Sequence, residues 1–164
     1  MNCILENNKA WIDETWDKIC VKLRRNCELV KDKIPSVTTD GVYDDKSEKG
    51  ISCWTNGFWP GIMWLMYDAT GDEAFRQTAE HVEKELDRAL NSFKSLDHDV
   101  GFIWGLSAGA NYCLTKNEKS KNRMLHAAAS LASRYHVNGG YIKAWNWKSN
   151  EAMYKLKGFD KLFW

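Results

Sequence analysis

An internal repeat is the feature of this sequence that most constrains its fold. Two similar segments stand 45 residues apart when Tyr67 is aligned with Tyr112. Each segment has a glycine-aromatic pair, a short apolar stretch, a polar turn and a longer amphipathic stretch. The pairs are Gly57-Phe58 and Gly101-Phe102. Two helices in a period of this length are typical of helical repeat proteins. The sequence therefore predicts helical hairpins that pack side by side.

The turns inside the two segments support this prediction. Asp72 and Asn117 each precede the longer stretch, and their side-chain oxygens can accept the unpaired amide hydrogens of a helix's first turn. Gly71 suits the left-handed conformation that ends the preceding helix. We therefore expect helix boundaries at these turns in both copies.

The two helices of each hairpin differ in polarity. The first, over about residues 57–67 and 101–112, is apolar nearly all round, whereas the second has a face rich in Lys, Glu and Arg. Such a pair predicts inner and outer helices of a ring. A further amphipathic helix is expected over about residues 9–32, ended by Pro35. The predicted fold class is all-α, an incomplete α/α toroid.

Length and charge exclude several classes of protein. A chain of 164 residues with 44% apolar residues is the size of one domain with its own core. Its net charge is +1 with acids and bases interspersed, so nothing indicates a nucleic-acid partner. The first residues lack a basic segment followed by an apolar run, and no stretch approaches a membrane span of about 20 residues. We expect a cytoplasmic protein without membrane contact.

The five cysteines, at positions 3, 20, 27, 53 and 113, contain no C-x-x-C pair. We expect reduced and mostly buried thiols. Phosphate-binding loops of the G-x-x-x-x-G-K and G-x-G-x-x-G types are absent from the sequence, and so is a nucleophile motif around Ser107 or Cys113. Neither a nucleotide cofactor nor covalent catalysis is therefore predicted.

The predicted ring brings three distant segments to one rim. If the inner helices run in the same direction, the residues just before them share that rim: Trp54, the run from Asp97 to Asp99, and, after a third glycine-aromatic step, Trp145. Nine tryptophans in the chain favour an aromatic-lined cleft, and a flat ring beside polar groups suits a sugar. Trp54 and Trp145 are equally well interpreted as core residues at this point.

Asp97-His98-Asp99 allows three interpretations. An acid at the start of a helix is stabilised by the helix dipole, although one acid is enough for that. A metal site would need further ligands, and the other histidines fall on or after outer helices, so no metal is predicted. Two carboxylates in a desolvated cleft suit proton transfer, because burial and mutual repulsion raise the pKa of one of them. We favour proton transfer.

Several motifs resemble a known family. "WTNGFWPGIMWLMYDATGD", "LDHDVGF", "LSAGANY" and "GGYIKAWN" occur in order between about residue 10 and Asn146. They are similar to the N-terminal part of unsaturated glucuronyl hydrolases, glycoside hydrolase family 88. The resemblance implies an (α/α)6 barrel, which agrees with the predicted hairpins. It also implies that residues 1–146 are the N-terminal part of a catalytic domain.

The resemblance implies a hydrolase that releases 4,5-unsaturated uronic acid from oligosaccharides left by polysaccharide lyases. An aspartic acid protonates C4 of the enol ether, water adds at C5, and the resulting hemiketal opens and expels the remaining sugar. Asp99 matches an essential aspartate, His98 a substrate-contacting histidine, Trp54 a stacking aromatic and Trp145 a rim tryptophan. Asp97 matches none of these, so its interpretation as a helix cap stands.

The end of the sequence departs from the family. Residues 147–164 do not match the family. The resemblance implies a second aspartate that acts as general acid/base, and Asp160 does not take that role because its neighbours differ. We interpret this tail as the product of a truncated or frameshifted reading frame. An incomplete barrel exposes apolar surface, which would favour self-association through the open edge or cover by the aromatic tail residues. A noncatalytic remnant and an unsaturated rhamnogalacturonyl hydrolase remain alternatives.

Overall fold

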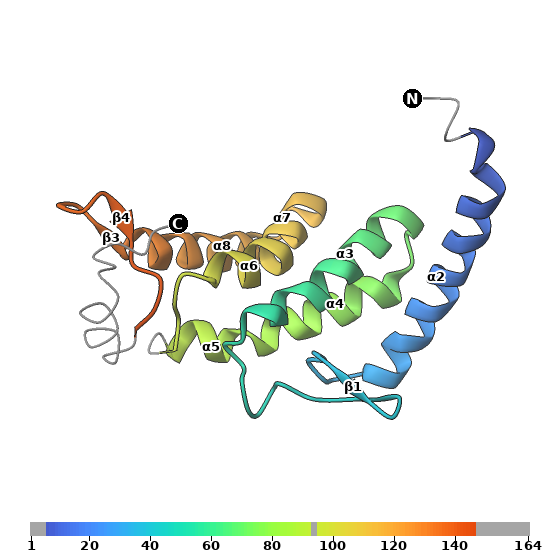
Figure 1. Ribbon diagram of the computed structural model, residues 1–164, viewed down its shortest axis with the longest axis horizontal. Coiled ribbons are helices and arrows are strands. Elements are labelled where there is room, and N and C mark those ends of the chain that lie inside the picture. The colour runs from blue at the N-terminus through green and yellow to red at the C-terminus, as the bar shows by residue number, and fades with distance from the viewer. Residues whose placement is uncertain (1–5, 93–94, 147–164) are drawn as a thin grey trace, which may run out of the picture.

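The structure is a computed structural model that describes residues 6–92 and 95–146 and consists mainly of helices (Figure 1). Two short antiparallel hairpins accompany them: β1 (Thr38–Thr39) with β2 (Val42–Tyr43), and β3 (Tyr135–His136) with β4 (Tyr141–Ile142). The helical elements in chain order are α2 (Lys9–Val30), η1 (Trp54–Gly57), α3 (Phe58–Thr70), α4 (Glu73–Glu85), α5 (Asp87–Ser92), α6 (Val100–Trp104), η2 (Gly105–Gly109), α7 (Ala110–Thr115) and α8 (Glu118–Ala132).

The two predicted helical hairpins are present. The first consists of α3 and α4, and the second consists of the α6–η2–α7 segment and α8, which lies beside the first (Figure 1). Asp72 accepts a hydrogen bond from the Ala74 amide, and Asn117 accepts from the amides at 119 and 120, so both predicted N-caps are confirmed. Gly71 has the predicted left-handed conformation, with φ of 69°. Lys116 has the same conformation in the second copy, with φ of 60°.

The first helix of the second hairpin differs from its counterpart by an internal π turn, η2. Ser107 lies within it, is fully buried, and donates a hydrogen bond to the Ile103 carbonyl at 2.6 Å. A π turn widens the helix locally and is frequent near functional sites. The 45-residue repeat did not predict this difference between the copies.

The core is formed by large apolar side chains of the two hairpins, of the C-terminal end of α2 and of the loop after α2. Gly57 allows the closest approach, since a Cβ there would lie 2.3 Å from the Phe102 carbonyl oxygen, whereas Gly101 has open space around it. The repeated glycines therefore serve different purposes. The largest fully buried apolar side chains are Trp64, Trp104, Phe75, Ile34, Met63, Leu86, Ile103, Val30, Val82 and Val100.

A buried polar network also joins the two hairpins. Glu83 on α4 is fully buried and accepts hydrogen bonds from Asn111 Nδ2 at 2.8 Å, Ser120 Oγ at 2.6 Å and Arg123 Nη1 at 2.8 Å. Arg123 also donates two hydrogen bonds to the Asp87 carboxylate, which raises the pKa of the guanidinium. Glu83 thus connects the outer helix of one hairpin to both helices of the other.

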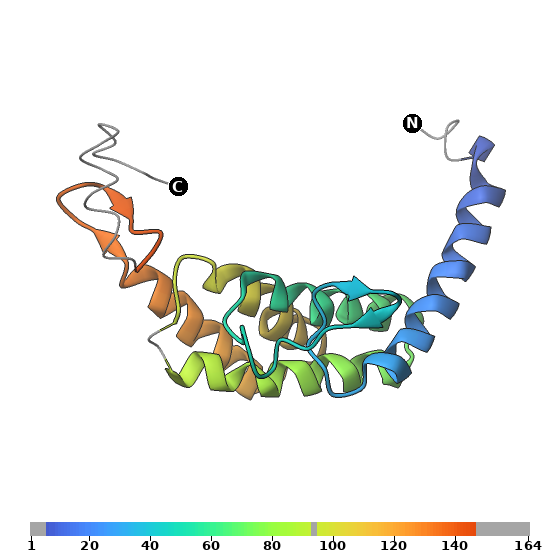
Figure 2. The same cartoon turned by 60° about the horizontal axis from the view of Figure 1, so that its bottom comes forward.

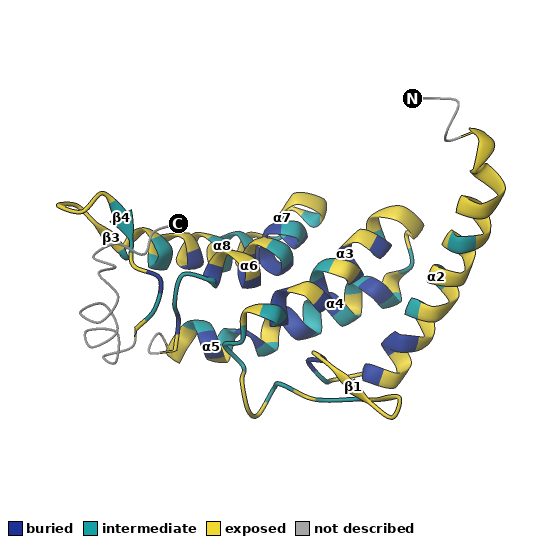
Figure 3. Cartoon of the chain, viewed as in Figure 1, coloured by how far each residue is buried: buried dark blue, intermediate teal, exposed yellow. Residues whose placement is uncertain are grey.

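Helix α2 follows the predicted bounds but is buried only near its C-terminal end. Asn26, Cys27 and Val30 are buried, and the N-terminal half extends away from the hairpins (Figures 2 and 3). Trp11 is 66% exposed and Trp16 40% exposed. The apolar stripe predicted from the sequence therefore reaches well beyond the region that the described hairpins cover.

The inner helices also present apolar side chains to solvent. Leu65 on α3 is 71% exposed and Leu114 on α7 is 39% exposed. A groove of about 380 Å³ runs between α3 and the η2–α7 segment, with Ile62 and Leu106 in its lining. Exposed apolar side chains of this kind are also what an incomplete toroid is expected to leave at its open edge. The tail residues expected to cover it, Phe159, Leu162, Phe163 and Trp164, lie outside the described residues.

The cysteine prediction holds only in part. Cys20, Cys27, Cys53 and Cys113 are free thiols, but Cys27 alone among these four is buried and Cys113 is exposed. Cys113 lies near the end of α7 and lines the groove between α3 and the η2–α7 segment, which the helical pattern alone did not indicate. Over the residues that the structure describes, no helix combines the length and the apolar character needed to cross a membrane.

Candidate active site

The Asp97-His98-Asp99 segment forms the turn that leads into α6. Asp99 is the N-cap residue of α6, yet its side chain makes no capping hydrogen bond. Asp97 Oδ1 instead accepts a hydrogen bond from the Asp99 amide at 2.9 Å. The expectation that Asp97 caps the helix is therefore wrong, because Asp97 lies two residues before the N-cap residue and orders the turn there. The Asp99 side chain is left available for another purpose.

The imidazole of His98 is held by the segment that carries Trp145. His98 Nδ1 lies 2.9 Å from the Ala144 carbonyl oxygen, and the His98 amide donates to the same oxygen at 3.1 Å. A carbonyl oxygen can only accept, so Nδ1 carries the hydrogen of this bond. The contact fixes the orientation of the ring and leaves Nε2 on the opposite side.

His98 Nε2 lies 3.3 Å from Asp99 Oδ1. With Nδ1 protonated, this contact is favourable in two states: a neutral Asp99 that donates to Nε2, or an Asp99 carboxylate beside an imidazolium. Both states place one proton between the two groups. The side chains of His98 and Asp99 are only 15% and 21% exposed, so solvent reaches this proton from a restricted side.

The environment of Asp99 raises the pKa of its carboxyl. Burial is the largest cause, the charge of His98 opposes it, and the negative charge of Asp97 adds to the increase. A raised pKa enlarges the fraction of neutral acid available near neutral pH. Asp99 is also the more buried of the two carboxyls, because its side chain is 21% exposed and that of Asp97 is 33% exposed.

Trp145 packs directly on His98. Their ring centroids are 5.5 Å apart, with an edge-to-face angle of 86°. The rim predicted from the sequence thus brings residues 98 and 145 together. Trp145 comes from the segment that follows β4, which confirms that this third glycine-aromatic step returns to the start of α6.

Trp54 packs against two phenylalanines, Phe58 and Phe102, that were not predicted as site residues from the sequence. It is 48% exposed, and its ring lies 5.6 Å from that of Phe58 and 6.0 Å from that of Phe102. Phe102 lies one helical turn after Asp99, and its amide donates to the Asp99 carbonyl. An exposed tryptophan of this kind presents a flat apolar face to solvent, which excludes the core interpretation of Trp54.

Asp97, His98 and Asp99 are the only trio of potential metal ligands with atoms within 4.8 Å of one another in residues 6–92 and 95–146. Because Nδ1 is engaged with the Ala144 carbonyl, the imidazole would offer Nε2, which already faces Asp99. One imidazole nitrogen and two single carboxylate oxygens are fewer than the four protein ligands of a structural zinc site. The absence of a metal stays a prediction.

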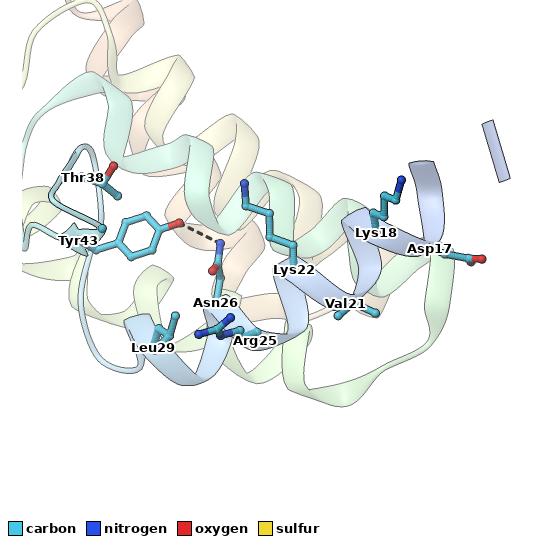
Figure 4. Close-up of a pocket in the computed structure, with 10 residues that line it drawn as sticks. Asp17, Lys18, Val21, Lys22, Arg25, Asn26, Leu29, Thr38 and Tyr43 are labelled. Carbon is cyan, nitrogen blue, oxygen red and sulfur yellow. Dashed lines mark hydrogen bonds between the residues drawn. The ribbon is translucent and has the colours of Figure 1, made fainter. Parts of the chain in front are cut away.

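A second hollow lies between α2 and the β1–β2 hairpin (Figure 4). It has a volume of about 650 Å³, and Asn26 Nδ2 donates to the Tyr43 hydroxyl at 2.9 Å within it. This bond holds the hairpin against α2. The hollow belongs to the α2 end of the molecule and shares no lining residue with the turn before α6. Its lining residues are Asp17, Lys18, Val21, Lys22, Arg25, Asn26, Leu29, Thr38, Gly41 and Tyr43.

Comparison with known proteins identifies relatives by sequence. No protein-family model matches the chain. Unsaturated glucuronyl hydrolase from Bacillus sp. strain GL1 is 37% identical over 131 residues, which cover 77% of this chain and 33% of that protein. Unsaturated chondroitin disaccharide hydrolase from Streptococcus pneumoniae strain R6 is 33% identical over 152 residues, which cover 90% of this chain and 37% of that protein.

Solved structures agree with the sequence comparison. The crystal structure of the Bacillus sp. GL1 unsaturated glucuronyl hydrolase matches with a TM-score of 0.67 at 35% identity, over 77% of this chain and 33% of that one. Another unsaturated glucuronyl hydrolase structure, described with dGlcA-Glc-Rha-Glc, matches with a TM-score of 0.71 at 33% identity over 85% of this chain and 37% of that one. These neighbours are all-α, as predicted. The chain spans about a third of the length of the curated relatives that it matches, and over that span its sequence and fold are similar to those of the unsaturated glucuronyl hydrolases.

Proposed function

We propose that this chain belongs to a glycoside hydrolase that releases 4,5-unsaturated uronic acid from lyase-generated oligosaccharides, with Asp99 as its catalytic carboxyl. We assign proton donation to Asp99 from its setting, whereas the resemblance alone gives that role to the family's second aspartate. The observation that carries the proposal is the half-buried Asp99 carboxyl, 3.3 Å from His98 Nε2, in a chain similar to unsaturated glucuronyl hydrolases. This similarity supports the hydrolase class. The site geometry supports the assignment of the acid.

The proposed reaction begins with proton transfer from the Asp99 carboxyl to C4 of the unsaturated ring. The C4–C5 double bond supplies the electron pair for the new C–H bond, and positive charge develops at C5 and the ring oxygen. Water adds at C5 and gives its proton to the Asp99 carboxylate, and the hemiketal opens and releases the remaining sugar. His98 orients the neutral Asp99 carboxyl, because its unprotonated Nε2 can accept a hydrogen bond from that carboxyl.

Trp54 and Trp145 are proposed to bind the substrate. Trp54 offers an exposed flat face that suits the unsaturated ring, and Trp145 flanks His98. The relatives support an unsaturated uronyl oligosaccharide as substrate: one is named for chondroitin disaccharide, and one structure is described with dGlcA-Glc-Rha-Glc. No cofactor is proposed.

The wider setting of the protein is also a proposal. Residues 1–146 form the first part of an (α/α)6-barrel catalytic domain, supported by the α/α-barrel neighbours. Free thiols at the described cysteines fit a cytoplasmic location. A second copy of the chain is proposed to pack against the open edge, supported by the exposed Leu65 and Leu114.

Turnover of unsaturated uronyl disaccharides tests the proposed function. The chain, shown by circular dichroism to be folded, is incubated with them, and the ultraviolet absorbance of the C4–C5 double bond is followed. We expect the absorbance to fall with time, and to fall faster for uronyl than for rhamnogalacturonan-derived substrates.

Two results would favour the alternatives. Constant absorbance in a folded sample would contradict the hydrolase proposal for this chain and leave a noncatalytic, sugar-binding remnant. A faster fall with unsaturated rhamnogalacturonan fragments would instead support the rhamnogalacturonyl hydrolase class.

A further inference from the structure

Arg134, which follows the end of α8, lies at the junction between the acid segment and the segment of Trp145. Its guanidinium donates hydrogen bonds to four acceptors that come from two separate parts of the chain. The acceptors are the Lys143 carbonyl at 2.6 Å, the Ala144 carbonyl at 2.8 Å, Asn146 Oδ1 at 2.8 Å and the Leu96 carbonyl at 3.3 Å.

These contacts connect the two segments of the chain that form the site. Leu96 directly precedes Asp97, is 5% exposed, and its carbonyl also accepts from Asn146 Nδ2 at 2.7 Å. Arg134 and Asn146 therefore fasten residue 96 to residues 143–146. The Lys143 amide donates a hydrogen bond to the Arg134 carbonyl at 2.9 Å, and this bond closes the base of the β3–β4 hairpin.

The Ala144 carbonyl is the most crowded of these acceptors. It receives Arg134 Nη2, His98 Nδ1 and the His98 amide at 2.8, 2.9 and 3.1 Å, and residue 144 is 5% exposed. Without Arg134 this carbonyl would be free to turn toward other donors. Because Nδ1 bonds to this oxygen, the position of the oxygen decides which way Nε2 points.

Burial lowers the pKa of Arg134, and the negative charge of Asp97 partly offsets that effect. The guanidinium nevertheless remains charged at any physiological pH. Its planar fork suits several acceptors at fixed angles, which a lysine ammonium cannot match from one position.

We propose that Arg134 is a positioning residue for the acid site: through the Ala144 carbonyl it holds His98 in the Nδ1–H form, with Nε2 directed at Asp99, and it holds Trp145 against the imidazole. The consequence for catalysis rests on the proposed function. The consequence for His98 does not, because it concerns the folded chain without substrate.

The test compares the wild type with Arg134→Met, which removes every donor and keeps most of the side-chain length, and with Arg134→Lys. The first readouts need no turnover: the nitrogen chemical shifts of the His98 imidazole, and hydrogen exchange of the His98 amide. We expect the wild type to show the Nδ1–H form. Arg134→Met should show a mixture of tautomers and at least tenfold faster exchange, and Arg134→Lys should fall between the two.

If the chain turns over substrate, kcat should fall about 10- to 100-fold in Arg134→Met, as expected when a catalytic group is displaced by about 1 Å. Arg76→Met is the matched control, since Arg76 on α4 bonds to Glu80, is partly exposed and carries the same charge. It should leave the His98 signals and kcat unchanged.

Unchanged His98 tautomer and amide exchange in a folded Arg134→Met variant would overturn the positioning role, whatever happens to turnover. If Arg134→Met does not fold, the Arg134→Lys spectrum decides in the same way. Absence of turnover in the wild type would count against the proposed function alone, because the His98 readouts remain valid.

Discussion

Changing Asp99 to asparagine is expected to abolish measurable turnover of unsaturated uronyl disaccharides. Asparagine keeps the size of the side chain but has no acidic proton to deliver to C4. General acid catalysis by a positioned side chain contributes about 10²- to 10⁴-fold to a rate, and the loss should be of that order. Initial rates of absorbance decrease, at equal concentrations of folded protein, give the ratio.

The stability of this variant separates lost chemistry from lost folding. The pKa of Asp99 is raised above 3.8 in the folded chain, so its protonated form contributes stability below that value, and this contribution is lost as pH rises through the folded-state pKa. The carboxylate is thus unfavourable in the fold at pH 7. Asparagine does not ionise, so Asp99→Asn should be at least as stable as the wild type there.

Asp97→Asn is the matched control for Asp99→Asn. An asparagine at 97 can still accept the hydrogen bond from the Asp99 amide, so the turn should be preserved. We expect less than about a tenfold change in turnover, since a group outside the proton transfer supplies none of the general-acid contribution. Equal losses in the two variants would contradict the assignment of Asp99 as the acid.

Replacing Glu83 by alanine should produce a large loss of stability. The substitution leaves Asn111 and Ser120 without their buried acceptor and removes one partner of Arg123. Breaking a buried ion pair in this way costs about 3–5 kcal/mol. Arg123 keeps its hydrogen bonds to Asp87, so we expect the free energy of unfolding to fall by an amount near the lower end of this range, about 3 kcal/mol. Urea denaturation measures it.

Glu80→Ala provides the control on the same helix. Glu80 lies three residues earlier and pairs with Arg76, and its side chain is 35% exposed. A surface ion pair contributes about 1 kcal/mol or less, so this variant should denature close to the wild type. Similar denaturation midpoints for the two variants would show that Glu83 does not join the hairpins as described.

The hairpins could be predicted from the sequence because their signals are local. Asp72 and Asn117 act on amides two or three residues away, and Gly71 needs only its own backbone freedom. The repeat then placed the start of α6 on the same rim as Trp54. The contact between His98 and Trp145 followed from that topology.

Other features depended on contacts that no local pattern reports. Glu83 was not singled out from the sequence, although its position four residues after Ala79 puts it on the buried side of α4. The role of Arg134 depends on acceptors 38 residues before it and 12 residues after it. The turn at Asp97 was interpreted as a cap because the sequence does not show which residue begins the helix.

The claim that Asp99 is the proton donor depends on its carboxyl holding a proton more readily than an ordinary aspartate does. Titration of the Asp99 carboxyl carbon by nuclear magnetic resonance, assigned with Asp99→Asn, measures this in the folded chain. The structure predicts a pKa above the ordinary value of 3.8. A pKa at or below 3.8 would contradict it.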